Sequence, residues 1–419
     1  MAAPEATPVL QMKKSLSNEI FDVVVVGGGF VGITLALALA RGGVRTALID
    51  AATAGAEATP SRPIALAEGS RRILEGLGLW NEISAGATPI RAVHVSDRGR
   101  FGFARLKASD YGVDALGYVS DAGEIGAVLG RVLDAAPEVT VFKPCSVHQL
   151  QFLEERVRVE CASAEGSLSL DTRLLAAADG GQSVVRRLSG IQARERDWEQ
   201  SAITATVKTR FDHGGVAYER FTADGPVALL PMGRRRSGLV WTLPHERAEA
   251  LMARDDASFL EALGETFGTR LGAFTEAGAR TRHRLHSAHS RLAVKPRLAL
   301  AGNAANHLHP VAGQGLNLGL RDAAILAEIV VDASRRGDDP GALATLKRYA
   351  DWRRVDQRST SQFTEAVVRL FSNDSVPLAL LRDAGLVGLD SFSFLKRTLS
   401  RHAMGLAGRG PRLSRGLPL

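Results

Sequence analysis

Three stretches of this chain share one pattern, in which a run of apolar residues ends at a glycine-containing turn. The first begins at Val23–Val26, a continuous apolar run typical of a strand that is buried on both faces of a parallel sheet. A glycine-rich turn follows, and residues 33–40 predict a helix packed against that strand. Thr46–Ile49 predicts a second strand, which ends at Asp50.

The glycines of this first stretch fill a dinucleotide-binding fingerprint. Gly27, Gly29 and Gly32 occupy the pattern G-x-G-x-x-G, and Asp50 follows Gly29 by 21 residues. Near that spacing, an acidic residue takes the ribose hydroxyls of a bound dinucleotide. No Gly-Lys-Ser/Thr follows the glycines, which excludes a nucleoside-triphosphate loop.

The second stretch comes late, at residues 298–328. An apolar strand ends at Ala301, Gly302-Asn303 predicts a turn, and a loop stiffened by Pro310 leads to Gly313-Gln314-Gly315. A helix is expected next, because apolar residues recur at helical spacing. These are Leu316, Leu320, Ala324 and Ala327. Such a loop presents backbone N–H groups to an electron-rich ligand, and its glycines remove side chains where a flat ring would approach.

The third stretch is residues 174–187. An apolar strand ends at Asp179-Gly180, and Ser183 precedes a helix start that carries Arg186 and Arg187. Asp179 and Gly180 suit the approach of a pyrophosphate or a second nucleotide. An ordinary helix N-cap explains the same residues, and the two interpretations remain open.

The middle of the chain alternates apolar and polar residues, which predicts half-buried strands of a mixed sheet that interrupts the nucleotide-binding domain. The segments are 92–96, 117–120, 157–160, 202–209, 217–221 and 239–243. Residues 343–371 are strongly helical, and residues 376–404 predict two more helices. The expected fold is α/β, with a Rossmann-like domain, an inserted mixed-sheet domain and C-terminal helices.

This organisation predicts seven consecutive segments. They are a disordered leader (1–20), a first nucleotide-domain part (21–90), substrate-domain strands (91–120), a second nucleotide-domain part (121–195), the substrate-domain mixed sheet (196–290), a third nucleotide-domain part (291–340) and C-terminal helices with a basic tail (341–419).

Composition fits an ordinary enzyme. The 419 residues are 45% hydrophobic and 23% charged, which allows a large core. Only Cys145 and Cys161 are cysteines, so a reduced, cytoplasmic setting is expected. No apolar run reaches the length of a transmembrane helix.

Two features of charge suggest other functions. The net charge of +7 would suit a nucleic-acid-binding protein, but the basic residues are dispersed and aromatic residues make up only 5%, so no nucleic-acid partner is expected. His283, His286 and His289 have a spacing possible for metal ligands. Four arginines crowd them and no carboxylate lies among them, so an edge strand is the preferred interpretation and no metal site is expected.

The three glycine-turn stretches, in this order, resemble the group A flavoprotein monooxygenases, whose fold is typified by p-hydroxybenzoate hydroxylase. Within that family the chain resembles the ring hydroxylases of ubiquinone biosynthesis, in the 2-polyprenyl-6-methoxyphenol hydroxylase branch. The supporting segments are residues 61–66, 77–80, 93–99, 115–118, 219–222, 225–231 and 240–242. Most of the superfamily has Gly-Asp-Ala-Ala-His in the late motif, where this chain has Gly302-Asn303-Ala304-Ala305-Asn306. Asn303 keeps a hydrogen-bonding side chain but loses the charge.

The resemblance implies FAD as the bound cofactor, NAD(P)H as a transient electron donor, and O2 and a polyprenylated phenol as substrates. Reduced flavin would form a C4a-hydroperoxide that transfers oxygen to the ring. The implied cofactor-binding residues are Gly27, Gly29, Gly32, Asp50, Arg62, Asp179, Gly180, Gly302, Asn303, Pro310, Gly313, Gln314, Gly315, Leu316 and Asn317. Backbone N–H groups at 313–315 would face the flavin O2/N1 edge, and Pro310 would lie near C4a. Pro310, Gln314 and His309 are the candidate catalytic residues, with His309 either relaying a proton or orienting the loop.

Other interpretations stay in view. A flavin oxidoreductase or hydroxylase of the same fold could act on another aromatic or lipid substrate. Residues 391–419 contain six Lys/Arg and no Asp/Glu, so peripheral contact with the inner face of a membrane, or docking to other ubiquinone-pathway proteins, is a further expectation. Packing of this segment on the flavin domain is the alternative.

Overall fold

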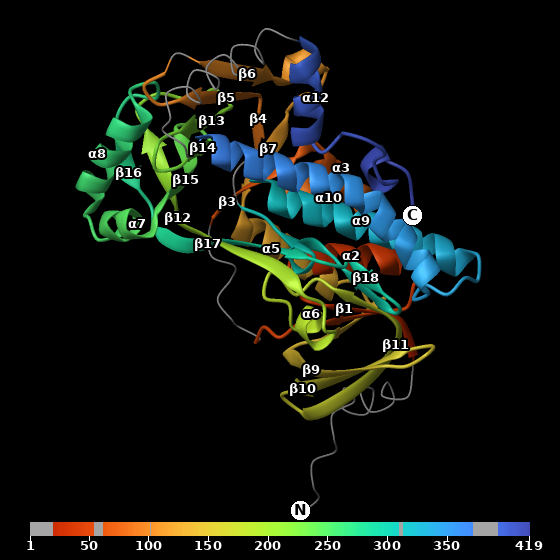
Figure 1. The fold of residues 1–419 in the computed structure, drawn as a ribbon. Coiled ribbons are helices and arrows are strands. Elements are labelled where there is room, and N and C mark those ends of the chain that lie inside the picture. Colours follow the sequence, from red (N-terminus) through yellow and green to blue (C-terminus); the bar gives the residue numbers. More distant parts are fainter. Residues whose placement is uncertain (1–19, 54–61, 101, 310–312, 372–392) are drawn as a thin grey trace, which may run out of the picture.

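The computed structural model describes residues 20–53, 62–100, 102–309, 313–371 and 393–419 (Figure 1). The expected leader lies outside these residues except for Ile20, which begins the first strand. Pro310 and the first of the two helices expected within 376–404 also lie outside them.

The first large sheet carries all three glycine turns. Its strands run in the order β18-β19-β11-β1-β2-β8, and the four pairings from β19 to β8 are parallel. Their bounds are β1 (Ile20–Val26), β2 (Thr46–Ile49), β8 (Val139–Phe142), β11 (Gly166–Ala177), β18 (Val294–Lys295) and β19 (Leu298–Leu300). An antiparallel pair, β9 (Cys145–Phe152) and β10 (Val157–Ser163), extends from β11.

The apolar run of β1 serves two cores, because successive side chains of a strand point to opposite faces. Val23 and Val25 pack into one apolar cluster with helices, whereas Val24 and Val26 pack into another beside β9 and β10. The helices that contribute to the first cluster are α2 (Phe30–Arg41), α3 (Glu68–Gly76), α4 (Trp80–Ser84), α5 (Ala122–Asp134), α9 (Gln314–Arg335) and α10 (Leu343–Phe371). The short helix α6 (Val184–Leu188) contributes to the second cluster.

The second large sheet runs in the order β20-β17-β12-β15-β14-β13-β5-β6, with β16 on β12. Its strands are β5 (Ala92–Asp97), β6 (Phe103–Lys107), β12 (Ala193–Thr209), β13 (Val216–Phe221), β14 (Val227–Pro231), β15 (Arg236–Pro244), β16 (Phe274–Ala277), β17 (Thr281–Ser290) and β20 (Asn306–His307). One face packs against α7 (His245–Met252) and α8 (Asp256–Phe267), which lie to one side in Figure 1.

A third, small sheet lies between the two large ones. It consists of β3 (Pro63–Ala67), β7 (Gly117–Asp121) and β4 (Thr88–Ile90) in the order β3-β7-β4. Residues 117–120, expected in the inserted sheet, lie instead in β7 of this small sheet. Residues 157–160 lie in β10 of the first sheet, within the segment expected to be the second nucleotide-domain part. Alternation shows that a strand has one buried face, but it does not identify the strand's neighbours.

The end of the chain packs onto the rest. After α12 (Ser393–Ala403), Met404 and Leu413 are buried. Arg412 pairs with Asp332 and Glu328 of α9. The short 3-10 turns are η1 (Ala108–Tyr111), η2 (Gly302–Ala304) and η4 (Leu413–Arg415). None of the described helices is long and apolar enough to cross a membrane.

Candidate functional site

The three glycine turns meet at one edge of the first sheet. Strands β1, β2, β11 and β19 are parallel, so their carboxyl ends share that edge, where ligands bind in open α/β sheets. Ala178 N–H donates to Val26 O at 2.8 Å, and Ala301 N–H donates to Ala177 O at 2.8 Å. These bonds place the turns at Gly27, Asp179 and Gly302 side by side.

The first turn has one glycine that faces open space. A Cβ at Gly27 would lie 2.4 Å from Ala178 O, and one at Gly32 would lie 1.8 Å from Gly27 O. These two glycines permit close backbone packing, and Gly27 also has a positive φ of 114°. No atom lies within 4 Å of a Cβ built on Gly29, the N-cap of α2. Gly29 thus leaves a cradle at a helix N-terminus, which suits a pyrophosphate.

Asp50 closes one side of this cradle. Its carboxylate carbon would lie 2.4 Å from a Cβ on Gly28, so it contacts the glycine turn directly. Lys143 Nζ lies 3.2 Å from Asp50 Oδ2, and Ala52 N–H donates to Oδ1 at 3.3 Å. This carboxylate therefore lies beside the glycine turn and keeps acceptor capacity that suits a ribose hydroxyl.

Asp179 has one satisfied oxygen and one orphaned oxygen. Its Oδ2 accepts from Val185 N–H at 3.0 Å, whereas Oδ1 is buried and has no hydrogen-bond partner among the described residues. Ser183, and not Asp179, is the N-cap of α6. A buried acceptor without a donor indicates a missing ligand or water, and Gly180 beside it has a φ of 85°.

The late turn and the start of α9 lie against α2. A Cβ on Gly302 would lie 3.2 Å from Val31 of α2, and one on Gly319 would lie 2.7 Å from the same side chain. Asn303 is exposed, and its Oδ1 would lie 3.9 Å from a Cβ on Gly315. The N-termini of both helices therefore lie near each other at the same sheet edge, where their dipoles favour negative charge.

Two predicted side chains at the start of α9 bind protein groups. Asn317 donates to Ala65 O and Gly313 O, both at 2.9 Å, and accepts from Ala67 N–H at 2.7 Å. Gln314 donates to Ala403 O at 3.3 Å. These side chains fasten α9 to β3 and to the end of α12. Gly313 caps the helix with a φ of 60°, and Leu316 packs on the first core.

His309 and Arg62, the two remaining candidate site residues within the described part of the chain, differ in burial. His309 is buried, its ring meets Trp198 edge-on at 5.1 Å, and desolvation, aided by Arg196, lowers its pKa to about 4. Arg62 is exposed just before β3, where its charge adds to burial in lowering the pKa of His283. The pair His286 and His307 is in ring contact at 4.4 Å.

Two residues with strongly shifted pKa values were missed by the sequence analysis. His307 Nδ1 lies 2.1 Å from the position of a Cβ on Gly181, directly after the Asp179 turn, and burial lowers its pKa to about 4. Glu219 of β13 is partly buried, and desolvation alone raises its pKa to about 7. It points away from the face that packs on α8, because its neighbour Tyr218 packs there. A carboxylate inside an apolar strand pattern was the available signal.

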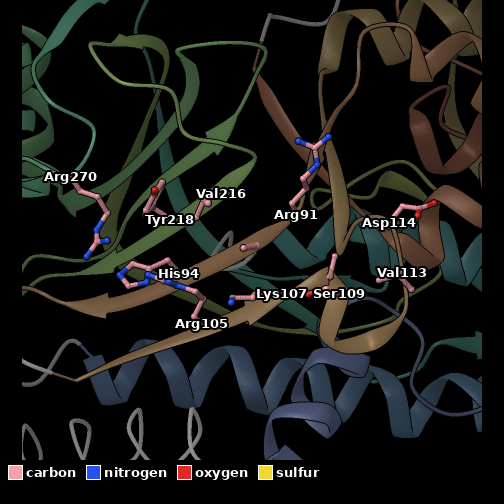
Figure 2. Close-up of a pocket in the computed structure, with 12 residues that line it drawn as sticks. Arg91, His94, Arg105, Lys107, Ser109, Val113, Asp114, Val216, Tyr218 and Arg270 are labelled. Carbon is pink, nitrogen blue, oxygen red and sulfur yellow. The ribbon is translucent and has the colours of Figure 1, made fainter.

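A cavity of about 540 Å³ lies elsewhere, at the β5–β6–β13 end of the second sheet (Figure 2). Its lining includes Arg91, His94, Arg105, Lys107 and Arg270, and none of the predicted site residues. His94 and Tyr218 face it, so it opens on the α8 side of the sheet and not on the Glu219 side.

Comparisons with known proteins agree with this geometry. A family model described as "FAD binding domain" matches residues 21–362. Ubiquinone hydroxylase UbiL of Rhodospirillum rubrum is 38% identical, over 96% of this chain and 94% of that protein. The 3-demethoxyubiquinol 3-hydroxylase of Escherichia coli is 31% identical, over 93% of this chain and 100% of that protein. Among solved structures, p-nitrophenol 4-monooxygenase PnpA from Pseudomonas putida has a TM-score of 0.76 at 21% identity, covering 93% of this chain and 99% of that one.

The relatives confirm the predicted family and FAD as cofactor, and the solved structure confirms the fold class. The open space at Gly29 and the unpartnered Asp179 oxygen are features of this structure that fit such a cofactor. The chain therefore belongs to the FAD-binding-domain family, together with the hydroxylases of ubiquinone biosynthesis, and is an FAD-dependent enzyme.

Proposed function

We propose that this protein is an FAD-dependent monooxygenase that uses NAD(P)H and O2 to hydroxylate the phenolic ring of a polyprenylated ubiquinone precursor. One observation carries the proposal. Three strand ends converge on an open helix N-terminus at Gly29, in a chain that aligns over nearly its whole length with ubiquinone hydroxylases. Bound FAD supplies electron transfer and oxygen activation.

The chain's own residues bind and orient that cofactor in this proposal. Gly27, Gly29 and Gly32 admit the pyrophosphate to the α2 N-terminus, and Asp50 accepts from the ribose. The orphaned oxygen of Asp179 accepts a hydrogen bond next to Gly180. Gly302 and Asn303 contact the ribitol side, and backbone groups from Gly313 to Asn317 face the flavin ring. Pro310 and Arg62 complete the proposed set of cofactor-binding residues.

The catalytic roles follow from charge and position. His309, whose pKa is about 4, stays neutral near pH 7, so it can hold or orient a proton but does not supply a cation there. Gln314 contributes through its backbone, since its side chain is bonded to Ala403. The second sheet, on the Glu219 side, forms the wall of the aromatic-ring site. Residues 91–120 and 196–290 constitute the substrate domain in this proposal.

The test is product analysis with purified holoenzyme, a short-chain prenylphenol, NAD(P)H and ¹⁸O2. We expect one ¹⁸O atom in the ring and faster anaerobic flavin reduction when the phenol is present. Reduction that the phenol stimulates without ring oxygenation would favour a flavin oxidoreductase of the same fold. Oxygenation of a different aromatic substrate alone would favour the alternative hydroxylase.

We also propose a cytoplasmic protein that touches the inner membrane face peripherally, because a polyprenyl tail partitions into the bilayer. Apolar side chains near the C-terminus would add to this contact, and those from Leu378 to Phe392 lie outside the described residues. Of the six basic residues, Arg409 packs over Trp352 and Arg412 pairs with α9. Arg397 and Arg401 are exposed on α12 and are the better candidates for lipid contact.

Point variants test this contact better than truncation, since removing the segment after Asp390 would also remove buried Leu413. In Arg397→Gln/Arg401→Gln, the free energy of binding to anionic vesicles should weaken by about 1 kcal/mol per charge removed. Co-sedimentation measures this loss. The control Arg187→Gln/Arg234→Gln removes two exposed charges elsewhere. Equal loss in both variants, or no salt dependence, would contradict a role for α12. Docking to other pathway proteins would appear as co-purification that does not depend on lipid.

A further inference from the structure

The cavity at the end of the second sheet has a strongly basic lining. Figure 2 shows the side chains of Arg270, Arg105 and Lys107 around the His94 ring. His94 and Tyr218 are register partners on β5 and β13, and Arg105 of β6 is the register partner of His94. The strand pairing itself therefore brings these groups onto one face.

Three of these cations, Arg91, Lys107 and Arg270, have no carboxylate partner among the described residues. Asp114 lines the far side of the cavity. Arg105 and Arg270 both act electrostatically on Tyr218, so their charges converge on its hydroxyl end. Like charges held together without compensation are unfavourable unless an anion joins them.

Arg220 adds positive charge beside this cluster, although it is not among the residues that line the cavity. It lies two residues beyond Tyr218 on the same face of β13, and its Nη1 lies 3.6 Å from the position of a Cβ on Gly268, near Arg270. Its Nε is buried and has no hydrogen-bond partner among the described residues. Burial and the charges of Arg98 and Arg270 lower its pKa, and Asp97 opposes them only in part.

We propose that this cavity binds a phosphate group, carried either by the headgroup of an anionic lipid or by a soluble phosphate ester. A phosphate carries up to two charges and several acceptor oxygens, which match convergent guanidinium forks better than a single carboxylate does. The Tyr218 hydroxyl can donate to it as well. Since the site lies on the face opposite Glu219, it is separate from the proposed flavin site and does not depend on the proposed reaction.

The direct test is equilibrium dialysis of the holoenzyme with radiolabelled inorganic phosphate at low ionic strength. Wild type should bind phosphate saturably, and Lys107→Gln/Arg270→Gln should weaken binding at least about tenfold. Both residues are exposed, so the variant should fold, which retained flavin content and circular dichroism would verify. The matched control Arg234→Gln removes an exposed charge from the β14–β15 turn and should leave the affinity within about twofold of wild type.

Absence of saturable binding in the wild type, or equal affinity in Lys107→Gln/Arg270→Gln, would overturn the proposal. Vesicles then separate the two sources. Binding to vesicles of phosphatidic acid or phosphatidylglycerol that inorganic phosphate competes away, and that the double variant loses, identifies a lipid headgroup. Phosphate binding without such vesicle binding identifies a soluble phosphate ester.

Discussion

The backbone N–H of Gly302 donates a hydrogen bond to Asp322, with 2.9 Å between the nitrogen and Oδ2. Arg353 and Gln357 of α10 donate to the other oxygen of this fully buried carboxylate. Burial raises the pKa of Asp322, and the charge of Arg353 opposes that rise. The late glycine turn is thus anchored to α10 through a buried ion pair.

Breaking the buried Arg353–Asp322 ion pair should lower the stability of the protein. We expect Arg353→Met to lower the free energy of unfolding by about 3–5 kcal/mol, because it leaves the Asp322 carboxylate buried without its cation. Adding Asp322→Asn should restore part of the loss, which urea unfolding in a double-mutant cycle would measure. As control, Arg336→Met breaks the exposed pair with Asp338 and should change stability by less than about 1 kcal/mol. A wild-type urea midpoint for Arg353→Met would contradict the anchoring role.

Replacement of Gly29 should abolish flavin binding without unfolding the protein. A Cβ there meets no protein atom within 4 Å beyond its chain neighbours, and a valine side chain would occupy the proposed pyrophosphate cradle. The matched control is Gly130→Val in α5, since a Cβ on Gly130 also meets nothing within 4 Å. Apo-protein titrated with FAD by flavin fluorescence should show micromolar or tighter binding for the control and none for Gly29→Val. Equal affinities would remove the α2 N-terminus from the site.

Glu219 should make stability depend on pH around neutrality. Its pKa is raised from 4.5 to about 7, so the folded protein holds this proton more tightly than the unfolded chain does. Its stabilising contribution is complete below the unfolded pKa and is lost as pH rises through about 7. The unfolding free energy of Glu219→Gln, relative to wild type, should therefore increase between about pH 5 and pH 8. The same comparison with Glu261→Gln, at an exposed site on α8, is the surface control.

His309 should titrate far below neutrality. Because desolvation lowers its pKa from 6.5 to about 4, its contribution to stability is complete above the unfolded pKa and is lost as pH falls through about 4. NMR of ¹³C-labelled imidazole carbons, with His309→Gln for assignment, would give the midpoint. A midpoint near 6.5 would contradict the burial described here and would make His309 a source of pH dependence in turnover.

Much of the cofactor-binding edge was predictable from local pattern. The apolar run before Gly27, the glycine spacing and the strand end at Asp50 each depend on residues close in sequence, because a buried strand and a tight turn place steric demands on those residues themselves. The helix at 343–371 was also predicted from local pattern, and the structure has α10 over Leu343–Phe371. The residue roles assigned to this edge stay predictions.

Only the tertiary structure decided which partners these local elements meet. Asn317 has the sequence context of a ligand-binding loop, yet its amide bonds to the backbone of β3, 250 residues away from it at Ala67. Arg412 lies in a segment that looks like a basic tail, yet it pairs with α9. The raised pKa of Glu219 and the unbalanced charge around Arg220 likewise arise from burial by distant strands. Local composition determines what a residue can do, whereas desolvation and long-range pairing determine which of those capacities it uses.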